Sequence, residues 1–378
     1  MKLINDEDCD WLRNFENRLL FELFVAYLEA RRGGKRGTFD EHKFEVREFE
    51  NLVNLRDSIL DRSYRPSRGT AHIIHNPVIR EIFAASFRDR IVHHWIYDIV
   101  CDWWDRHFIY DSYSCREGKG TKFGIDRLMR QVQACSDNYK YKVWVIKLDI
   151  QGYFMSLPRD RLYKRAIWGL DQQFRGNYGR KYELVKFLWW QTIFDNPCKG
   201  VRKKGWPEDW ADLPDTKSLF KQPPGIGIVI GNLTSQLLSN IYLDQLDRYI
   251  IYDLGWKYYG RYVDDFYILA TDEEMPRALG DVVAIERFVE RLGLKLHPHK
   301  RYIQLVDNGV AFLGGVVYPG RVYPGRRLIR NAGVAFSETV EGVRDVESVI
   351  SYLGHMKHMS SKKILSELFD KAGWVFSF

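Results

Sequence analysis

The chain has 378 residues, of which 45% are apolar and 28% are charged. This balance is ordinary for a globular protein and excludes a disordered, collagen-like or low-complexity chain. The 57 Lys and Arg residues outnumber the 50 Asp and Glu residues, and the resulting net charge of +7 permits a polyanionic partner without proving one.

No apolar run approaches the roughly 18 residues of a transmembrane helix, so we expect no membrane contact. The acidic start of the sequence is unlike a secretory signal. The five cysteines are scattered and form no CxxC pair, which argues against a zinc site or a disulfide framework. A reducing, cytoplasmic location is therefore expected.

Helices are predicted in the N-terminal 62 residues. Residues 15–30 place apolar side chains at helical spacing, and a second helical pattern covers residues 46–60. The basic, glycine-broken loop at 31–37 lies between them and is either a solvated connection or an RNA phosphate contact. We expect residues 1–62 to form an N-terminal helical extension.

The rest of the chain alternates between helical and β-rich patterns. Residues 64–82 are predicted to be extended and rich in loops, and the proline-rich stretch 197–224 is predicted to be an irregular insert. Strands are predicted at 143–150, near 301–305 and at 310–318. Helices are predicted at 83–110, 159–195, 233–250, 281–292 and through most of 319–378.

Three acidic residues carry the main chemical signal. Two short β-prone runs flank Asp264 and Asp265, which predicts a hairpin with these acids at its tip. Asp149 ends the strand at 143–150, and if the two strands are neighbours in one sheet, Asp149 and Asp264 meet. Divalent metal would relieve their repulsion, and two ions about 4 Å apart can clamp the oxygens of a phosphoryl transfer. Taken alone, an Asp-Asp pair is weak evidence, because two unrelated surface acids give the same pattern.

Seven segments, in chain order, resemble the motifs of reverse transcriptases. Residues 262–265 (YVDD) resemble the polymerase signature of that family, and residues 148–154 (LDIQGYF) resemble its first catalytic strand. The other segments are 87–94, 113–121, 230–243, 294–300 and 312–315. The Ser235–Gln236 pair in segment 230–243 is typical of prokaryotic reverse transcriptases from diversity-generating retroelements, to which the chain is most similar.

The resemblance implies an α+β fold of the right-hand polymerase type. Fingers and palm would cover residues 63–318, with an antiparallel sheet backed by helices, and a small helical thumb would cover residues 319–378. Basic thumb residues would follow the backbone of a template–primer duplex, unless they form only a solvated face. These residues are Arg326, Arg327, Arg330, Lys357, Lys362 and Lys363.

The resemblance also implies catalytic and metal-binding roles. Asp149, Asp264 and Asp265 would be the catalytic acids, with Asp265 in an outer or structural place. The metal ligands would be Asp149, Asp264 and the carbonyl of Ile150. Lys300 resembles the lysine that protonates departing pyrophosphate, and a surface lysine is the alternative. Two Mg²⁺ ions, or Mn²⁺ in their place, would be the cofactors and dNTPs the substrates.

Six residues are implied to contact the nucleotide, namely Arg80, Phe154, Ile230, Gly231, Gln236 and Tyr262. Arg80 would grip the triphosphate, but residues 76–79 (NPVI) replace the lysine that often precedes it, so a second phosphate contact is unassigned. Phe154 would be an aromatic gate against the ribose 2′-hydroxyl, or else a core aromatic. Ile230 stands where many members have glutamine, and relatives with an apolar residue there misincorporate opposite template adenines. Relaxed fidelity is therefore expected.

The implied activity is RNA-directed DNA synthesis, which makes cDNA from a noncoding RNA template with a DNA or RNA primer. We expect a diversity-generating retroelement with its own noncoding RNA and a small basic accessory protein. The alternative is a bacterial antiphage defence enzyme that makes immune cDNA, alone or with a partner reverse transcriptase. A noncatalytic RNA-binding scaffold and a two-metal nuclease are more remote, because all three acids are present and a nuclease needs no aromatic gate.

Overall fold

The computed structural model describes residues 13–32, 36–75 and 78–374, and the chain forms two compact units. The first unit comprises Met1–Phe108, Gly152–Gln245 and Leu292–Leu294, and the second comprises Ile109–Gln151, Leu246–Arg291 and Lys295–Phe378. Parts of two expected segments, residues 33–35 of the basic loop and residues 76–77 before Arg80, lie outside the described residues. Within the described ranges, every helix is too short or too polar to cross a membrane.

The N-terminal part of the first unit is helical, as the periodicity predicted. It contains α2 (Phe15–Ala30), α3 (Phe39–Glu45) and α4 (Glu48–Leu60). Helix α2 begins after Asn14, whose side chain accepts a hydrogen bond from the Glu16 amide. Its buried face packs on α5 (Phe87–His107), which joins the N-terminal helices to the rest of this unit. The expected domain divisions at residues 62 and 318 stay predictions.

A small sheet follows α4 in the first unit. It contains β1 (Thr70–Ile74), β2 (Arg80–Ala84) and β4 (Arg202–Lys203) in the order β2-β1-β4, with β2 antiparallel and β4 parallel to β1. The predicted helix at 83–110 therefore begins too early. Residues 83 and 84 belong to β2, where they continue its alternation of buried and partly exposed side chains. The Ser86 side chain then caps α5 by accepting a hydrogen bond from the Asp89 amide.

The remaining helices of the first unit correct one prediction and confirm two. The helix expected at 159–195 is two helices, α8 (Arg159–Gln173) and α9 (Arg180–Phe194). The chain breaks at Gly176, whose φ of 76° is left-handed. The insert at 197–224 is irregular, with only the short helix α10 (Pro207–Ala211) and two 3₁₀ turns besides β4. Helix α11 (Leu233–Arg248) confirms the helix predicted there.

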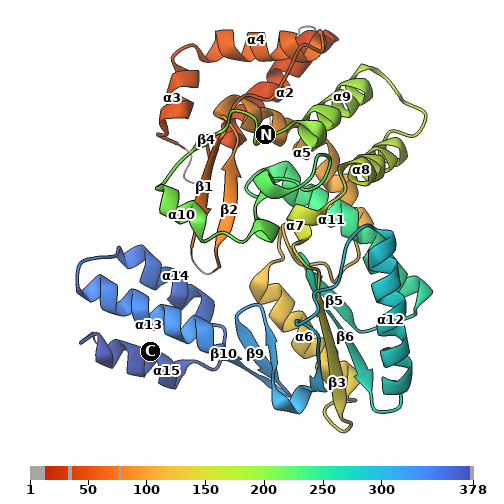
Figure 1. Cartoon of the computed structure of the whole chain (residues 1–378), viewed down its shortest axis with the longest axis vertical. Coiled ribbons are helices and arrows are strands. Elements are labelled where there is room, and N and C mark those ends of the chain that lie inside the picture. Colours follow the sequence, from red (N-terminus) through yellow and green to blue (C-terminus); the bar gives the residue numbers. More distant parts are fainter. Residues whose placement is uncertain (1–12, 33–35, 76–77, 375–378) are drawn as a thin grey trace. The chain divides into compact units, whose positions relative to one another are not determined.

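The second unit is built on a four-stranded antiparallel sheet with the order β5-β6-β3-β7. Its strands are β3 (Val143–Asp149), β5 (Tyr259–Tyr262), β6 (Asp265–Thr271) and β7 (Tyr302–Leu305). One face packs on α6 (Thr121–Cys135), and α12 (Met275–Arg291) also contacts β6 (Figure 1). The core against α6 includes Leu128, Val145, Tyr267 and Leu269. Because side chains alternate along a strand, this face also carries Lys147, Asp149 and Asp265 at its end.

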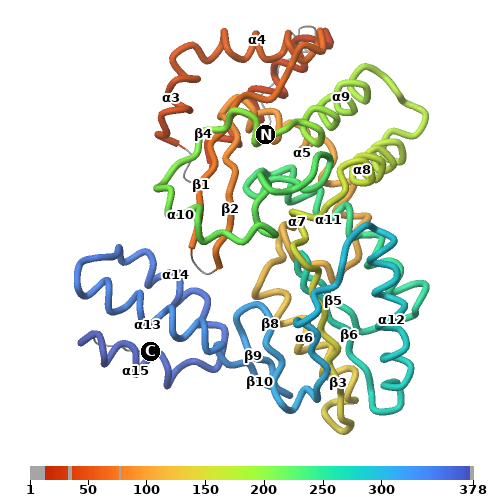
Figure 2. The backbone as a smooth tube through the Cα atoms, in the orientation of Figure 1, coloured from red at the N-terminus to blue at the C-terminus, as the bar shows by residue number. Residues whose placement is uncertain are grey.

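A second sheet and three helices complete this unit. The strand predicted at 310–318 is a hairpin of β8 (Val310–Phe312) and β9 (Gly315–Tyr318), because Leu313 and Gly314 both take positive φ. Strand β10 (Arg321–Pro324) pairs with β9, so the C-terminal segment does not start as a helix. From there the chain runs into α13 (Arg326–Val340), α14 (Val346–Met356) and α15 (Lys362–Lys371) (Figure 2). These helices share their own core around Phe336.

Candidate active site

The acidic pair lies at the turn between β5 and β6, as the sequence predicted. Tyr262 pairs with Asp265, so Val263 and Asp264 form a two-residue loop. Val263 has a φ of 57°, which matches the twist of a tight hairpin but is rare for a β-branched residue. The turn therefore presents Asp264 at its tip, and Val263 takes a backbone conformation that valine does not favour.

Strand β3 brings Asp149 to this turn. Asp149 pairs with Asp265 in the antiparallel ladder, and the amide of Ile150 donates to the Asp264 carbonyl at 3.1 Å. Burial, followed by the nearby charge of Asp149, raises the pKa of Asp264 to about 6. The three acids thus lie together, and the negative charges of Asp149 and Asp264 repel each other.

Two lysines offset part of this negative charge. Lys300 Nζ lies 3.0 Å from each carboxylate oxygen of Asp149, and Lys147 Nζ lies 2.8 Å from Asp265 Oδ2. Burial raises the pKa of Asp265, and the Lys147 ammonium opposes that rise. Sequence reasoning missed Lys147, although its place two residues before Asp149 puts both side chains on one face of β3.

The donor set suits a hard divalent cation that keeps part of its water. Within the described ranges, no three His, Cys, Asp or Glu side chains are arranged to hold a metal ion. Asp265 is paired with the mostly buried Lys147, whereas Asp149 is paired with Lys300, which is half-exposed and more easily displaced by a cation. The carboxylates best placed for a metal are therefore those of Asp149 and Asp264. Mg²⁺ is commonly held by one or two carboxylates together with waters and substrate phosphates. Two repelling, partly buried carboxylates therefore fit such an ion.

Ile230 and Gly231, two of the residues expected to contact the nucleotide, pack against strand β2 in the first unit. The Phe83 amide donates to the Ile230 carbonyl at 2.8 Å. Gly231 has a φ of 122°, and a Cβ at this position would lie 2.4 Å from the Phe83 oxygen. Glycine is therefore required where the two segments meet. Arg80 is exposed at the start of the same strand.

The other expected nucleotide contacts are spread over both units. Phe154 lies in the short helix α7 (Tyr153–Ser156), half-buried, with its ring 5.5 Å from that of Tyr153. Gln236 is exposed in the first turn of α11. Tyr262, in the second unit, packs partly against the core of the four-stranded sheet. Apart from Tyr262, the expected nucleotide contacts belong to the first unit, whereas the acids and Lys300 belong to the second.

The first unit also contains a cavity of about 310 Å³, which sequence reasoning missed. Its lining carries charges of both signs, and the buried side chains of His93 and Ser235 contribute polar groups. The charged residues are Arg68, Asp89, Arg159, Asp195 and Lys199. His93 Nδ1 lies 2.8 Å from Thr234 Oγ1, which ties α5 to the start of α11. The signal available in the sequence was Ser235 in the Ser-Gln pair that resembles a polymerase motif.

His93 is expected to make the protein less stable in mild acid. Burial lowers its pKa to about 4, against about 6.5 when unfolded. In the folded state His93 therefore resists protonation. The free energy of unfolding that its neutral form contributes above pH 6.5 is lost as the pH falls toward 4. His93 alone should remove about 2 kcal/mol between pH 7 and pH 5.

Urea unfolding at both pH values checks this expectation. His93→Gln should flatten the difference between pH 7 and pH 5, and replacement of the exposed His355 by glutamine should not. An equal pH response in the wild type and in His93→Gln would contradict the assignment.

Comparison of the sequence with family models places the chain in a family. Among solved structures, apo telomerase from Candida tropicalis is similar, with a TM-score of 0.49, 11% sequence identity, and coverage of 96% of this chain and 77% of the telomerase chain. No curated protein matches the sequence. The family model "Reverse transcriptase (RNA-dependent DNA polymerase)" matches residues 76–317, which is well over half of the chain. The chain therefore belongs to the reverse transcriptase family, enzymes that join dNTPs on an RNA template with the help of divalent metal ions.

Proposed function

We propose that this chain copies a noncoding RNA into cDNA by two-metal nucleotidyl transfer, with Asp149, Asp264 and the Ile150 carbonyl as metal ligands. The observation that carries the proposal is the meeting of two partly buried carboxylates where β3 adjoins the β5–β6 turn. Bound divalent ions would lower the pKa of the primer 3′-hydroxyl and hold the triphosphate.

The two lysines support different roles for the acids beside them. Lys300 is half-exposed and contacts Asp149, so a cation bound to Asp149 would release its ammonium group. The released lysine would be placed to give a proton to departing pyrophosphate. Asp265 is paired with Lys147 on the same face, which supports a structural role rather than metal ligation.

The first unit offers groups for the incoming dNTP. Arg80 and the Ile230–Gly231 peptide are both fixed to β2, which supports a shared role in holding the nucleotide. The guanidinium of Arg80 would bind the triphosphate. Phe154 is only half-buried, which leaves part of its ring available as a gate against the ribose 2′-hydroxyl. Gln236 and Tyr262 would complete the nucleotide contacts.

Nucleic acid would be held by charge and by shape. The cavity beside Ser235 would receive part of the RNA template, and Arg68, Arg159 and Lys199 would bind its phosphate against the opposing charges of Asp89 and Asp195. The six basic residues expected to follow the template–primer backbone are all exposed, which supports that role. They are Arg326, Arg327, Arg330, Lys357, Lys362 and Lys363.

Primer extension tests this proposal. Purified protein, dNTPs and Mg²⁺ or Mn²⁺ are mixed with a primer annealed to RNA, and also with RNA that co-purifies with the protein. We expect product that depends on both template and metal. Absence of product on every template, from folded protein, would contradict the proposed polymerase activity.

We further propose a diversity-generating retroelement, with relaxed fidelity and a small basic accessory protein. The support is Ile230, which is half-buried against the core around Phe83 and has no side-chain group that can hydrogen-bond a nucleotide. Sequenced cDNA would show errors clustered opposite template adenines. Uniform errors, with the same yield on any RNA, would instead favour a defence enzyme.

Ile230→Gln is expected to reduce misincorporation opposite adenine, by about tenfold if glutamine gains one hydrogen bond to the correctly placed nucleotide. Error counts per template base in cDNA from the wild type and the variant measure the change. Ile230→Val removes a methylene without adding a polar group and serves as the control. An unchanged error spectrum in Ile230→Gln, with extension retained, would exclude this role for residue 230.

A further inference from the structure

The turn that carries Asp264 needs support from side chains beyond its own two residues. Val263 is β-branched and takes a φ of 57°, although nothing in its own side chain favours that conformation. Residues in rare backbone conformations persist only when their surroundings fix them. The question is therefore which groups hold Val263 in place.

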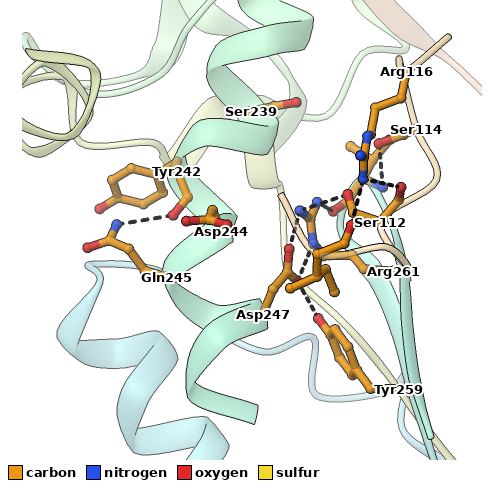
Figure 3. Close-up of polar contacts among 12 residues, drawn as sticks. Ser112, Ser114, Arg116, Ser239, Tyr242, Asp244, Gln245, Asp247, Tyr259 and Arg261 are labelled. Atoms are coloured by element: carbon orange, nitrogen blue, oxygen red, sulfur yellow. Dashed lines mark hydrogen bonds and ion pairs between the residues drawn. The ribbon is translucent and has the colours of Figure 1, made fainter. Parts of the chain in front are cut away.

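Two side chains form hydrogen bonds with the backbone of Val263. Arg261 Nη1 donates to the Val263 carbonyl at 2.9 Å, and the Val263 amide donates to Ser114 Oγ at 3.1 Å. Side chains thus hold both the amide and the carbonyl group of Val263. Figure 3 shows Ser114 and Arg261, which come from two different segments of the chain.

Arg261 is itself anchored away from the turn. Its side chain is fully buried, and Nε and Nη2 donate to the two carboxylate oxygens of Asp247 at 2.7 Å each. Tyr259 also donates to Asp247, which lies near the end of α11 (Figure 3). The fork of the guanidinium leaves Nη1 aimed at the turn, a geometry that a lysine ammonium cannot reproduce.

The segment that carries Ser114 is fixed to the same strand. The Arg261 amide donates to the Asp111 carbonyl at 2.9 Å, and the Tyr113 amide donates to the Arg261 carbonyl at 2.9 Å. Arg116 Nη1 donates to the Ser112 carbonyl at 3.1 Å. Arg261 therefore joins the turn to the end of α11 through its buried side chain. It joins them to the segment before α6 through its backbone and through Nη2, which donates to Ser112 Oγ at 3.3 Å.

We propose that Arg261, with Ser114, is a positioning residue that sets the place of the Asp264 carboxylate by clamping Val263. Asp264 follows Val263 directly, and its carbonyl is tied to the residue after Asp149. If the clamp is lost, the turn relaxes and the spacing of the two carboxylates changes. This inference rests on the proposed metal-binding role of Asp149 and Asp264.

Direct binding of Mn²⁺, followed by electron paramagnetic resonance, tests the inference without measuring activity. Arg261→Lys should raise the apparent Kd for Mn²⁺ about tenfold, the effect of one hydrogen bond. Val263→Gly relieves the strained conformation, so Arg261→Lys in that background should change the Kd by less than about threefold. Arg127→Lys is the control, because Arg127 makes a comparable paired contact with Asp111 and has no bond to the turn.

The outcomes separate this inference from the proposed function. An equal loss of Mn²⁺ affinity in both backgrounds would mean that Arg261 acts only through its ion pair with Asp247, and would overturn the clamp. If Arg261→Lys does not fold, Ser114→Ala in the same two backgrounds replaces it and is read in the same way. Wild-type protein that binds no Mn²⁺ at the Asp149 and Asp264 site would instead contradict the proposed function.

Discussion

Asp264→Asn should lower kcat for primer extension by about 10³-fold and, at the same time, stabilise the protein. A metal-binding carboxylate supplies several kcal/mol of transition-state stabilisation, and about 4 kcal/mol corresponds to a factor of 10³. The same carboxylate is unfavourable in the folded state, because its burial and the charge of Asp149 raise its pKa to about 6. Removing the charge should therefore stabilise the fold by about 1 to 3 kcal/mol at pH 8.

The stabilisation expected from Asp264→Asn depends on pH. A folded-state pKa above the unfolded value means that the protonated carboxyl favours the folded state. The stability associated with it is present below pH 4 and is lost as pH rises through 6. The gain from Asp264→Asn should thus be large at pH 8 and close to zero at pH 4.

Asp272→Asn is the matched control, since Asp272 follows the other end of β6 and bonds the Trp144 indole. It should keep its activity and show no such gain at pH 8. Thermal unfolding and single-turnover extension measure the two effects. An Asp264→Asn variant that is both inactive and destabilised would point to misfolding, and retained activity would remove Asp264 from the proposed metal site.

Patterns along the chain predicted the parts of the site that depend on local structure. Alternation and turn signals located β3 and the β5–β6 hairpin, and the meeting of Asp149 with Asp264 followed from pairing two strands. The fold class was predicted from the resemblance to reverse transcriptases, whereas the local patterns placed the helices and strands in nearly the right order. One helix break was missed, although Gly176, Asn177 and Gly179 form a turn-prone cluster between the two helices.

The parts that were missed depend on tertiary packing. The pairing of Lys147 with Asp265 needs the register of β3 against β6, which no local pattern fixes. The contact of Arg261 with Asp247 joins a strand to the end of a helix, and hydrophobic periodicity says nothing about which polar groups meet there. The cavity beside Ser235 is lined by segments distant in sequence, so composition could not reveal it.

Gly231→Ala should destabilise the protein by about 3 kcal/mol or more. The new Cβ would lie 2.4 Å from the Phe83 carbonyl oxygen and 3.0 Å from Ile82 Cγ2, and the Phe83 oxygen is a backbone atom of β2 that cannot move away easily. Overpacking of this kind typically costs about 1 to 3 kcal/mol, and a left-handed φ adds about 1 to 2 kcal/mol for a residue with a Cβ. Urea unfolding with a linear extrapolation measures the sum.

Gly225→Ala separates these two causes. Gly225 also has a left-handed φ, of 80°, but a Cβ there would meet no atom within 4 Å, so only the conformational cost of about 1 kcal/mol should appear. The difference in unfolding free energy between the two variants therefore measures the cost of the steric clash between residue 231 and β2. Because this peptide and Arg80 are proposed to hold the dNTP, Gly231→Ala should also raise KM for dNTP more than Gly225→Ala does. Equal losses of stability would show that the two segments do not approach as closely as the 2.8 Å hydrogen bond between Phe83 and Ile230 requires.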